Sequence, residues 1–259
     1  MKILFRNTGL IFSLTRREIE SRYKGSIFGV AWSLLTPIIM LSIYSFIFGY
    51  VFKNKWGMSG SENYTLAMFT GLLVHGFLAE CISKSTSIYV GNVSYVKKVF
   101  FPLESLCWVV VFSALFQLLM GSIVYAFFCI LLGQHVSYSV LLIPVIIAPL
   151  VLLSYSLSLI LSSLGVYIRD LNQLVSVLIS IMLFMSPVFY PVTAIPAEYR
   201  SFIYISPLTF IIESLREVII FDRIFSVEGY LIYVAVCLLT YFLSVFWFKK
   251  VSKGFADVL

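Results

Sequence analysis

Residues 105–168 read SLCWVVVFSALFQLLMGSIVYAFFCILLGQHVSYSVLLIPVIIAPLVLLSYSLSLILSSLGVYI, a stretch of 64 residues that holds no Asp, Glu, Lys or Arg. A helix that crosses the roughly 30 Å hydrocarbon core of a bilayer needs about 20 residues, and charged side chains are costly there. The stretch is too long for one such helix, and Gly133, Ser137 and Ser139 interrupt it near its middle. We therefore expect two membrane-spanning helices joined by a short turn.

Four further stretches without those charges occupy residues 25–52, 63–79, 171–197 and 229–248. The whole chain is 61% hydrophobic and 12% charged, with a mean hydropathy of +1.02, against about 45–50% and about 25% in soluble domains. This composition excludes an ordinary soluble enzyme. We predict an all-α integral membrane protein with one domain, residues 1–259, and six spans at approximately 27–52, 63–84, 105–132, 139–166, 171–192 and 229–248.

The basic residues predict how the chain is oriented. With six spans both termini share one side, and 13 of the 18 Lys and Arg residues fall there. The five on the other side are Lys53, Lys55, Arg200, Arg216 and Arg223. The positive-inside rule then places both termini in the cytoplasm. We read the net charge of +6 as topology rather than as a nucleic-acid surface, and expect no nucleic-acid partner.

Residues 1–26 suggest an amphipathic helix lying at the cytoplasmic interface. Arg16, Glu20 and Lys24 are spaced four residues apart, and Glu18 and Arg22 form a second pair with this spacing. An equally reasonable interpretation is a positively charged topology anchor.

A second amphipathic segment lies between the fifth and sixth spans, in residues 193–228. Its apolar residues recur at helical spacing opposite Glu213, Arg216 and Glu217, after a helix start at Ser206-Pro207. Pro187, Pro191 and Pro196 break the exit of the fifth span. We expect a re-entrant or surface-lying helical pair at the outer mouth; the alternative is a helix that only rests on the outer leaflet.

Motifs for chemistry are missing from the sequence. It contains no G-x-x-x-x-G-K-[ST] phosphate loop, no H-E-x-x-H and no G-x-S-x-G. We expect a protein that is not an enzyme, hydrolyses no ATP itself, and binds no metal or cofactor. His75 lies inside a span without an acidic neighbour in sequence, which favours a hydrogen-bonded histidine of the helix bundle over a proton relay.

Aromatic residues are abundant, at 17% of the chain, and two sets lie in the first span. Phe28 and Phe46, like Trp32 and Tyr50, are 18 residues apart, which is five turns of a regular helix. Tyr44, Phe48 and Phe52 follow a neighbouring face. Such stripes suit a pore along which sugar rings slide; the alternative is the aromatic belt found at membrane interfaces.

Five motifs together resemble one known family, the permeases of polysaccharide-exporting ABC transporters. They are Arg22-Tyr23-Lys24-Gly25-Ser26-Ile27-Phe28-Gly29 leading to Trp32 and Pro37, Val96-Lys97-Lys98-Val99-Phe100-Phe101-Pro102, Arg169-Asp170, Ser186-Pro187-Val188-Phe189-Tyr190-Pro191, and Ser206-Pro207-Leu208-Thr209. The resemblance covers essentially the whole chain. The chain departs from the family in having Leu103 before Glu104 where a basic residue is frequent, and Ser206 where Asn is frequent.

The resemblance implies partners and a substrate. Such permeases are homodimers that work with two copies of a separate ABC ATP-binding subunit, which holds the ATP and Mg, and they export a lipid-linked glycan (O-antigen, capsule or teichoic-acid type) across the bacterial inner membrane. Three other functions share parts of the pattern: an ABC permease for a drug or small lipid, an ion-coupled carrier, and a membrane scaffold that transports nothing.

The resemblance also implies four groups of site residues. Residues 88–104 would form the loop that couples to the ATPase, through Val96, Lys97, Lys98, Val99, Phe100, Phe101 and Pro102, although the two lysines also fit a topology signal alone. The substrate channel would be lined by Phe28, Trp32, Tyr44, Phe46, Phe48 and Tyr50. The carrier phosphates would be attracted by Arg16, Arg17, Arg22 and Lys24. The outer gate would contain Pro187, Tyr190, Pro207, Glu213, Arg216 and Glu217.

Overall fold

A computed structural model describes residues 7–51, 61–97, 101–133 and 138–258, without the side chains of 49–51, 61–63, 256 and 257. Every regular element in these residues is helical, so the predicted all-α class is confirmed. Five helical stretches are long and apolar enough to cross a membrane: Gly29–Phe48, Tyr64–Ser85, Glu104–Leu131, Tyr138–Tyr167 and Val227–Gly254. They correspond to five of the six predicted spans.

The remaining predicted span, the fifth at residues 171–192, is shorter than expected. Its helix α8 is Leu171–Met185, 15 residues that extend about 22 Å. Ser186 after it is extended, with ψ 151°, because the residue before a proline is disfavoured in the helical region and Pro187 follows. The apolar run in the sequence therefore continues past the true end of the helix.

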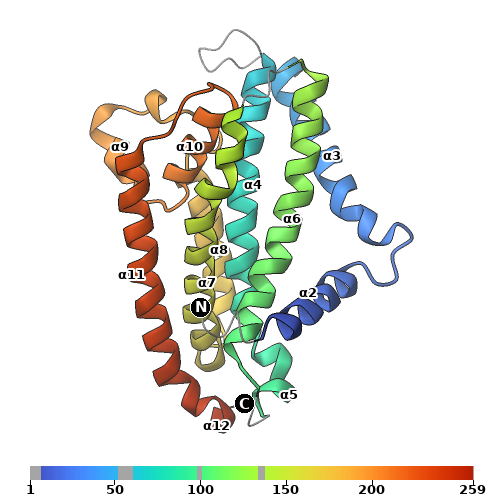
Figure 1. The fold of residues 1–259 in the computed structure, drawn as a ribbon, viewed down its shortest axis with the longest axis vertical. Helices are drawn as coiled ribbons and strands as arrows, with labels where there is room; N and C mark the ends of the chain where they lie inside the picture. The colour runs from blue at the N-terminus through green and yellow to red at the C-terminus, as the bar shows by residue number, and fades with distance from the viewer. Residues whose placement is uncertain (1–6, 52–60, 98–100, 134–137, 259) are drawn as a thin grey trace.

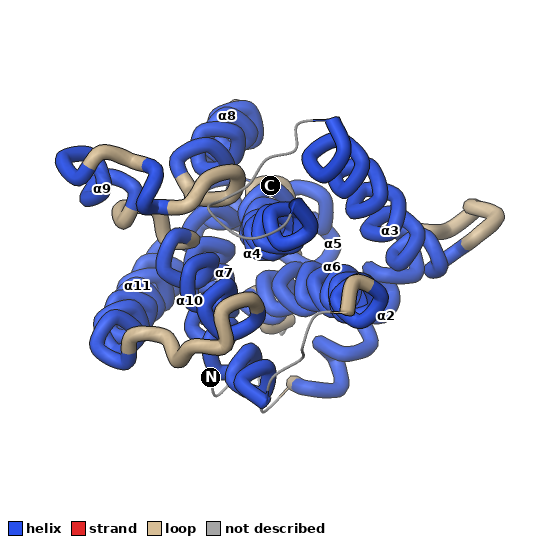
Figure 2. The backbone as a smooth tube through the Cα atoms, turned by 90° about the horizontal axis from the view of Figure 1, so that it is seen from above, coloured by secondary structure: helices blue, strands red, loops and turns tan. Residues whose placement is uncertain are grey.

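The long helices form an up-and-down bundle around α4, Ser61–Ser85 (Figure 1). Within the most apolar window of each span, 72% of α4 is buried, against 17–39% for the other spans. Around it lie α3 (Trp32–Tyr44), α6 (Glu104–Leu131), α7 (Ile143–Tyr167) and α8, and α11 (Val227–Val251) packs on the outer side of α7, as the view from above shows (Figure 2). We call the end that carries α5 (Val93–Val96) and α12 (Phe255–Val258) the basal end, and the opposite end apical.

Small residues let the helices approach closely, as is usual in membrane bundles. Gly165 of α7 lies directly against the carbonyl of Thr86, so that a Cβ at this position would overlap the carbonyl oxygen. His75 is buried in α4 and its Nε2 lies 3.1 Å from the carbonyl oxygen of Ile179 in α8. This contact agrees with a histidine that holds the bundle together.

Between α8 and α11 the chain forms η5 (Val192–Ala194), α9 (Ala197–Ile203) and α10 (Thr209–Ile219), all at the apical end (Figure 1). The predicted amphipathic helix is α10. It packs against α4 and α7, and Ile211 and Ile212 are completely buried. The alternative of a helix that only rests on a leaflet is therefore wrong, because α10 is part of the bundle core.

The predicted N-terminal helix is α2, Thr8–Arg22, at the side of the basal half of the bundle (Figure 1). It packs on α6, with Ile11 and Thr15 as its buried residues. A loop then leads to η1 (Gly29–Ala31) and α3, which continues as a π-helical segment, η2 (Ser45–Val51).

Candidate functional site

Two proline turns meet at the apical end. Ser186-Pro187 follows α8 and Ser206-Pro207 precedes α10, and the two serine hydroxyls lie 2.7 Å apart. Ser186 also donates a hydrogen bond to the carbonyl of Met182 (2.7 Å), so Ser206 is the donor between the two serines. The sequence suggested two separate turns; the structure joins them into one unit through this hydrogen bond.

Arg216 crosses from α10 into this unit. It is 2% exposed and its guanidinium makes three contacts: Nε donates to the carbonyl of Ala67 (2.9 Å), Nη2 to the carbonyl of Val188 (3.0 Å) and Nη1 to Glu213 (2.8 Å). Burial lowers the pKa of Arg216 to about 10, with Glu213 acting in the opposite direction, so the side chain stays protonated at neutral pH. One buried cation therefore ties α10 to α4 and to the turn after α8.

A glycine makes room for this arrangement. A Cβ on Gly71 of α4 would lie 3.0 Å from the Cα of Val188 and 3.3 Å from Nη2 of Arg216. Gly71 could not be selected from the sequence, because neither Val188 nor Arg216 is near it in the chain. Because Gly71 carries only a hydrogen where other residues have a Cβ, the turn after α8 can lie directly on α4.

The predicted gate residues fall into different environments. Pro187 is buried in the turn, and the Tyr190 hydroxyl donates to the carbonyl of Phe184 (2.6 Å). Glu213 is partly exposed. The pKa of Glu217 is raised by the burial of its own carboxyl group and by the negative charge of Glu213. The placement of Arg216 on the polar outer face of its helix was wrong, since backbone carbonyls from two other elements make its interior position favourable. Pro207 is half-buried beside Ser206.

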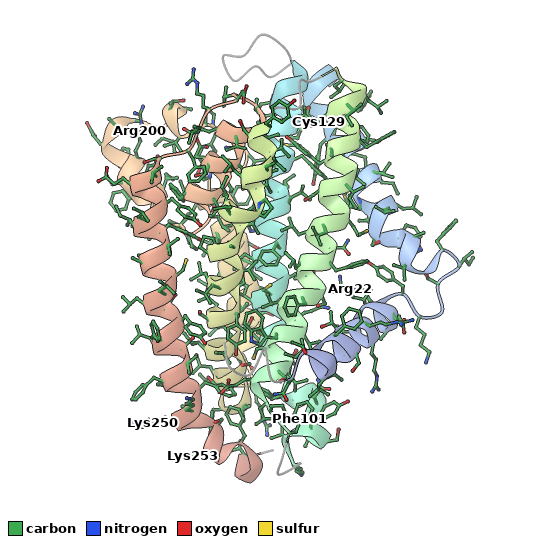
Figure 3. All side chains as sticks on the ribbon, viewed as in Figure 1. Arg22, Phe101, Cys129, Arg200, Lys250 and Lys253 are labelled. Carbon is green, nitrogen blue, oxygen red and sulfur yellow. The ribbon has the colours of Figure 1, made fainter. Side chains whose placement is uncertain are left out.

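A second cluster of charges joins α2 to α4 near the basal end. Arg22 forms an ion pair with Glu80, and Lys84 lies between Glu18 (2.9 Å) and Glu80 (3.4 Å). The side chains of Arg22, Glu80 and Lys84 are only 18–32% exposed. Burial disfavours the charged form of Arg22, but the attraction of Glu80 outweighs it and raises the pKa of Arg22. Figure 3 shows Arg22 where α2 gives way to the loop before α3.

The pairing within α2 was only partly predicted. Arg16 pairs with Glu20 as expected (2.7 Å), but Glu18 pairs with Lys84 of α4 rather than with Arg22. The partner missed by the sequence reasoning is Glu80. Its spacing of four residues from Lys84, at the end of the second span, was the available signal.

Of the four residues expected to attract carrier phosphates, Arg16 and Arg22 are thus paired with carboxylates. Arg17 and Lys24 are exposed, and neither forms an ion pair within the part of the chain that the structure describes. Arg17 lines a cavity of about 420 Å³ between α2, the start of α6 and the segment that follows α4. Of the four predicted residues, Arg17 and Lys24 are therefore the ones available to bind an external anion.

The expected coupling segment is described in part. It contains η3 (Val90–Asn92) and α5, and Lys97 is exposed at its basal tip. Val96 is 7% exposed and therefore packs inside the protein, while Phe101 stacks on Tyr95 with ring centroids 4.7 Å apart. Pro102 is half-buried just before α6. Lys98, Val99 and Phe100 lie outside the described residues. Figure 3 places Phe101 at the basal end, like Lys250 and Lys253.

The aromatic residues of the first span divide into two groups. Phe28, Trp32 and Phe46 are 57%, 36% and 63% exposed, and the first two rings meet edge to face at 5.7 Å. Tyr44 and Phe48 instead form a chain of ring contacts that reaches Tyr64 of α4, with 5.5 Å between the last two rings.

The prediction that these aromatic residues share faces of the first span was wrong in one respect. It assumed a regular α-helix, whereas η2 is a π-helix that shifts the later residues around the axis. The side chains of Tyr50 and Phe52 are outside the described part. The exposed stripe thus consists of Phe28, Trp32 and Phe46, and Tyr44 and Phe48 belong to the packing of the bundle.

Within the described residues, no three or more His, Cys, Asp or Glu side chains are grouped so that they could hold a metal ion. The four cysteines are buried and free. The features that stand out in the described residues are the contacts of Arg216 at the apical end, the charge cluster that joins α2 to α4, and the exposed rings of Phe28, Trp32 and Phe46.

Comparison with known proteins identifies the family of the chain. The family model described as ABC-2 type transporter matches residues 9–220. The O-antigen export system permease protein RfbA of Klebsiella pneumoniae is 29% identical, covering 98% of this chain and 97% of the relative; that of Myxococcus xanthus is 26% identical over 98% and 96%. The polysialic acid transport protein KpsM of Escherichia coli is 22% identical over 80% of each chain. On this match and the helical membrane fold, the chain belongs to the ABC-2 type transporter family.

Proposed function

We propose that the protein is the membrane-spanning permease subunit of an ATP-driven exporter that moves a lipid-linked polysaccharide of the O-antigen, capsule or teichoic-acid type across a bacterial inner membrane. The observation that carries this proposal is similarity over 98% of the chain to permeases whose names specify O-antigen export. The basal end, which holds Lys97, Lys250 and Lys253, would face the cytoplasm, in agreement with the positive-inside rule.

The proposed assembly is a homodimer with two copies of an ABC ATP-binding subunit that bind ATP and Mg. The ATPase would dock on residues 88–104, where the exposed Lys97 offers a steering charge. Tyr89 makes this segment a rigid lever, because its buried ring packs on Phe248 and Phe255 and its hydroxyl donates to the carbonyl of Leu103 (3.1 Å). Movement of the ATPase would thereby reach α4, α6 and α11.

The pore would lie between the two copies, along α3 and α8. The exposed Phe28, Trp32 and Phe46 supply flat apolar faces on which sugar rings stack without being held at one strong site. Arg17 and Lys24 would attract the phosphates of the lipid carrier at the cytoplasmic surface. The turn after α8, clamped by Arg216, would form the outer gate.

The test is deletion of the gene in its own host, with assay of carrier-linked glycan inside the cell and of glycan on the surface. Accumulation inside with loss outside, restored by the intact gene, supports the proposal. Unchanged pools on both sides would remove it and favour a permease for a drug or small lipid. Export that stops when the proton gradient is collapsed at constant ATP would indicate an ion-coupled carrier instead.

A further inference from the structure

An apolar groove of about 310 Å³ lies among α4, α6, α7 and α10, on the apical side of the bundle. Its walls include Val74 of α4, Ile147 of α7 and Leu215 of α10, and Leu119 and Ile123 of α6 stand at its mouth. The two mouth residues are 53% and 56% exposed, whereas Leu215 is 3% exposed. The groove therefore leads from the surface of the bundle to a buried face of α10.

The polar groups of the groove are already satisfied by the protein. The Thr70 and Tyr125 hydroxyls are hydrogen-bonded to each other (3.1 Å), Thr70 lies 3.0 Å from the carbonyl of Leu66, and Ser122 donates to the carbonyl of Leu118 (2.8 Å). None of the described residues that line the groove carries a charged side chain. A glycan or a phosphate would find no partner there, so the ligand must be hydrocarbon.

The size of the groove makes vacancy unfavourable. Protein interiors are close-packed, and an engineered apolar cavity of about 150 Å³ in a soluble protein stays dry and binds benzene. The groove has twice this volume, and its mouth opens from the surface of the membrane-spanning helix α6. Lipid tails are as apolar as leucine, and they are the material that surrounds this surface.

The position of the groove argues against a second copy of the chain as its occupant. Seen from above, α3 and α8 lie on one side of α4, and α7 and α10 lie on the other (Figure 2). A dimer formed along α3 and α8 would leave the mouth of the groove facing lipid. We propose that a hydrocarbon chain of a membrane lipid occupies this groove and completes the packing of α10.

The bound chain would contact α10 on the side opposite the turn after α8, which is the proposed outer gate. Leu215 and Ile219 face the groove, while Arg216, the residue next to Leu215, binds the carbonyls of Ala67 and Val188. The lipid chain and the arginine clamp therefore hold α10 from two directions. If the basal end faces the cytoplasm, as in the proposed function on which this step rests, the lipid belongs to the outer leaflet and is a structural component of the apical end.

The test uses the full-length protein in nanodiscs of phosphatidylglycerol and phosphatidylethanolamine that carry a diazirine on one acyl chain. After irradiation, labelled residues are mapped by mass spectrometry. We expect labelling of Leu215 or Ile219 in addition to exposed surface residues such as Leu239 of α11. Labelling that is confined to surface residues would overturn the proposal.

Two substitutions fill the groove, Ser122→Leu and Ala126→Phe, both at lining positions of α6. In either variant we expect labelling of α10 to be lost while labelling of Leu239 persists, and an unchanged melting temperature in detergent shows that the variant is folded. Persistence of the α10 label in both folded variants would overturn the proposal. So would efficient disulfide formation between copies carrying Ile123→Cys, since a second chain would then cover the mouth.

Discussion

Nη2 of Arg216 lies 3.0 Å from the carbonyl oxygen of Val188, 28 residues earlier in the chain, and this contact connects the helix α10 to the turn that ends α8. A backbone carbonyl next to a proline turn is a suitable acceptor, because the extended Ser186 leaves the following carbonyls without helical partners. The position of the turn thus depends on a side chain from a separate element. If this turn forms the outer gate, opening must break or move with the contact.

Replacement of Arg216 by alanine should lower the free energy of unfolding by about 3 kcal/mol, since two buried carbonyls and Glu213 lose their donor. Arg216→Lys should recover only part of this loss, because one ammonium group lacks the planar fork that reaches all three acceptors. Thermal unfolding in detergent measures both. The control is Arg223→Ala on the exposed segment after α10. Equal effects at Arg216 and Arg223 would contradict the clamp.

Gly71 and Gly76 form a matched pair within α4. Alanine at Gly71 should destabilise the protein, because its Cβ would lie 3.0 Å from the backbone of Val188 and both neighbours are buried. Alanine at Gly76 meets nothing within 4 Å and should be neutral or stabilise by about 0.5–1 kcal/mol through helix propensity. The melting temperature should therefore fall in the Gly71→Ala variant, and should stay unchanged or rise in the Gly76→Ala variant.

Glu80→Gln should loosen α2 from the bundle. It removes the carboxylate from Arg22 and one of two from Lys84, all partly buried, and we expect a loss of about 1–2 kcal/mol. The control Arg16→Gln breaks a pair whose side chains are 72% and 58% exposed, and should change nothing measurable. A double-mutant cycle of Arg22→Gln and Glu80→Gln measures the coupling; additive effects would show that the pair is not linked.

The spans could be predicted because charge within a bilayer is costly, and the chain places its charges between long apolar stretches. The end of α8 could not be predicted from this pattern, since the apolar stretch continues past Pro187 although the helix ends before it. The buried position of Arg216 was missed because helical periodicity assigns a residue to a face of its own helix. It contains no information about carbonyl groups that other elements place beside that face. Likewise, Glu18 and Arg22 fit a pair in one helix, and only the packing of α2 on α6, which lies beside α4, brings Lys84 and Glu80 into reach.

The division of the basic residues in α2 predicts which of them serve the carrier lipid. Arg17→Gln combined with Lys24→Gln removes charges that bind no described carboxylate, so stability should be unchanged while export falls. Surface glycan at equal protein level measures export. Lys253→Gln with Lys250→Gln at the basal end provides a control with the same charge loss. If both pairs of substitutions reduce export equally, the effect is one of net charge and not of a phosphate site.

The two aromatic groups of the first span should respond in different ways to truncation. Phe48→Ala removes a ring that contacts both Tyr44 and Tyr64, so thermal stability should fall by about 2–3 kcal/mol together with protein level. Phe46 is 63% exposed, so Phe46→Ala should leave stability nearly unchanged and reduce surface glycan if sugar rings slide along this stripe. Leu239→Ala, on an exposed face of α11, controls for the loss of an apolar surface residue. A channel wall that loses its stacking faces should slow the passage of a glycan. If a stable Phe46→Ala variant exports fully, and still does so when Trp32→Ala is added, the exposed aromatic residues form an interfacial belt and not a channel wall.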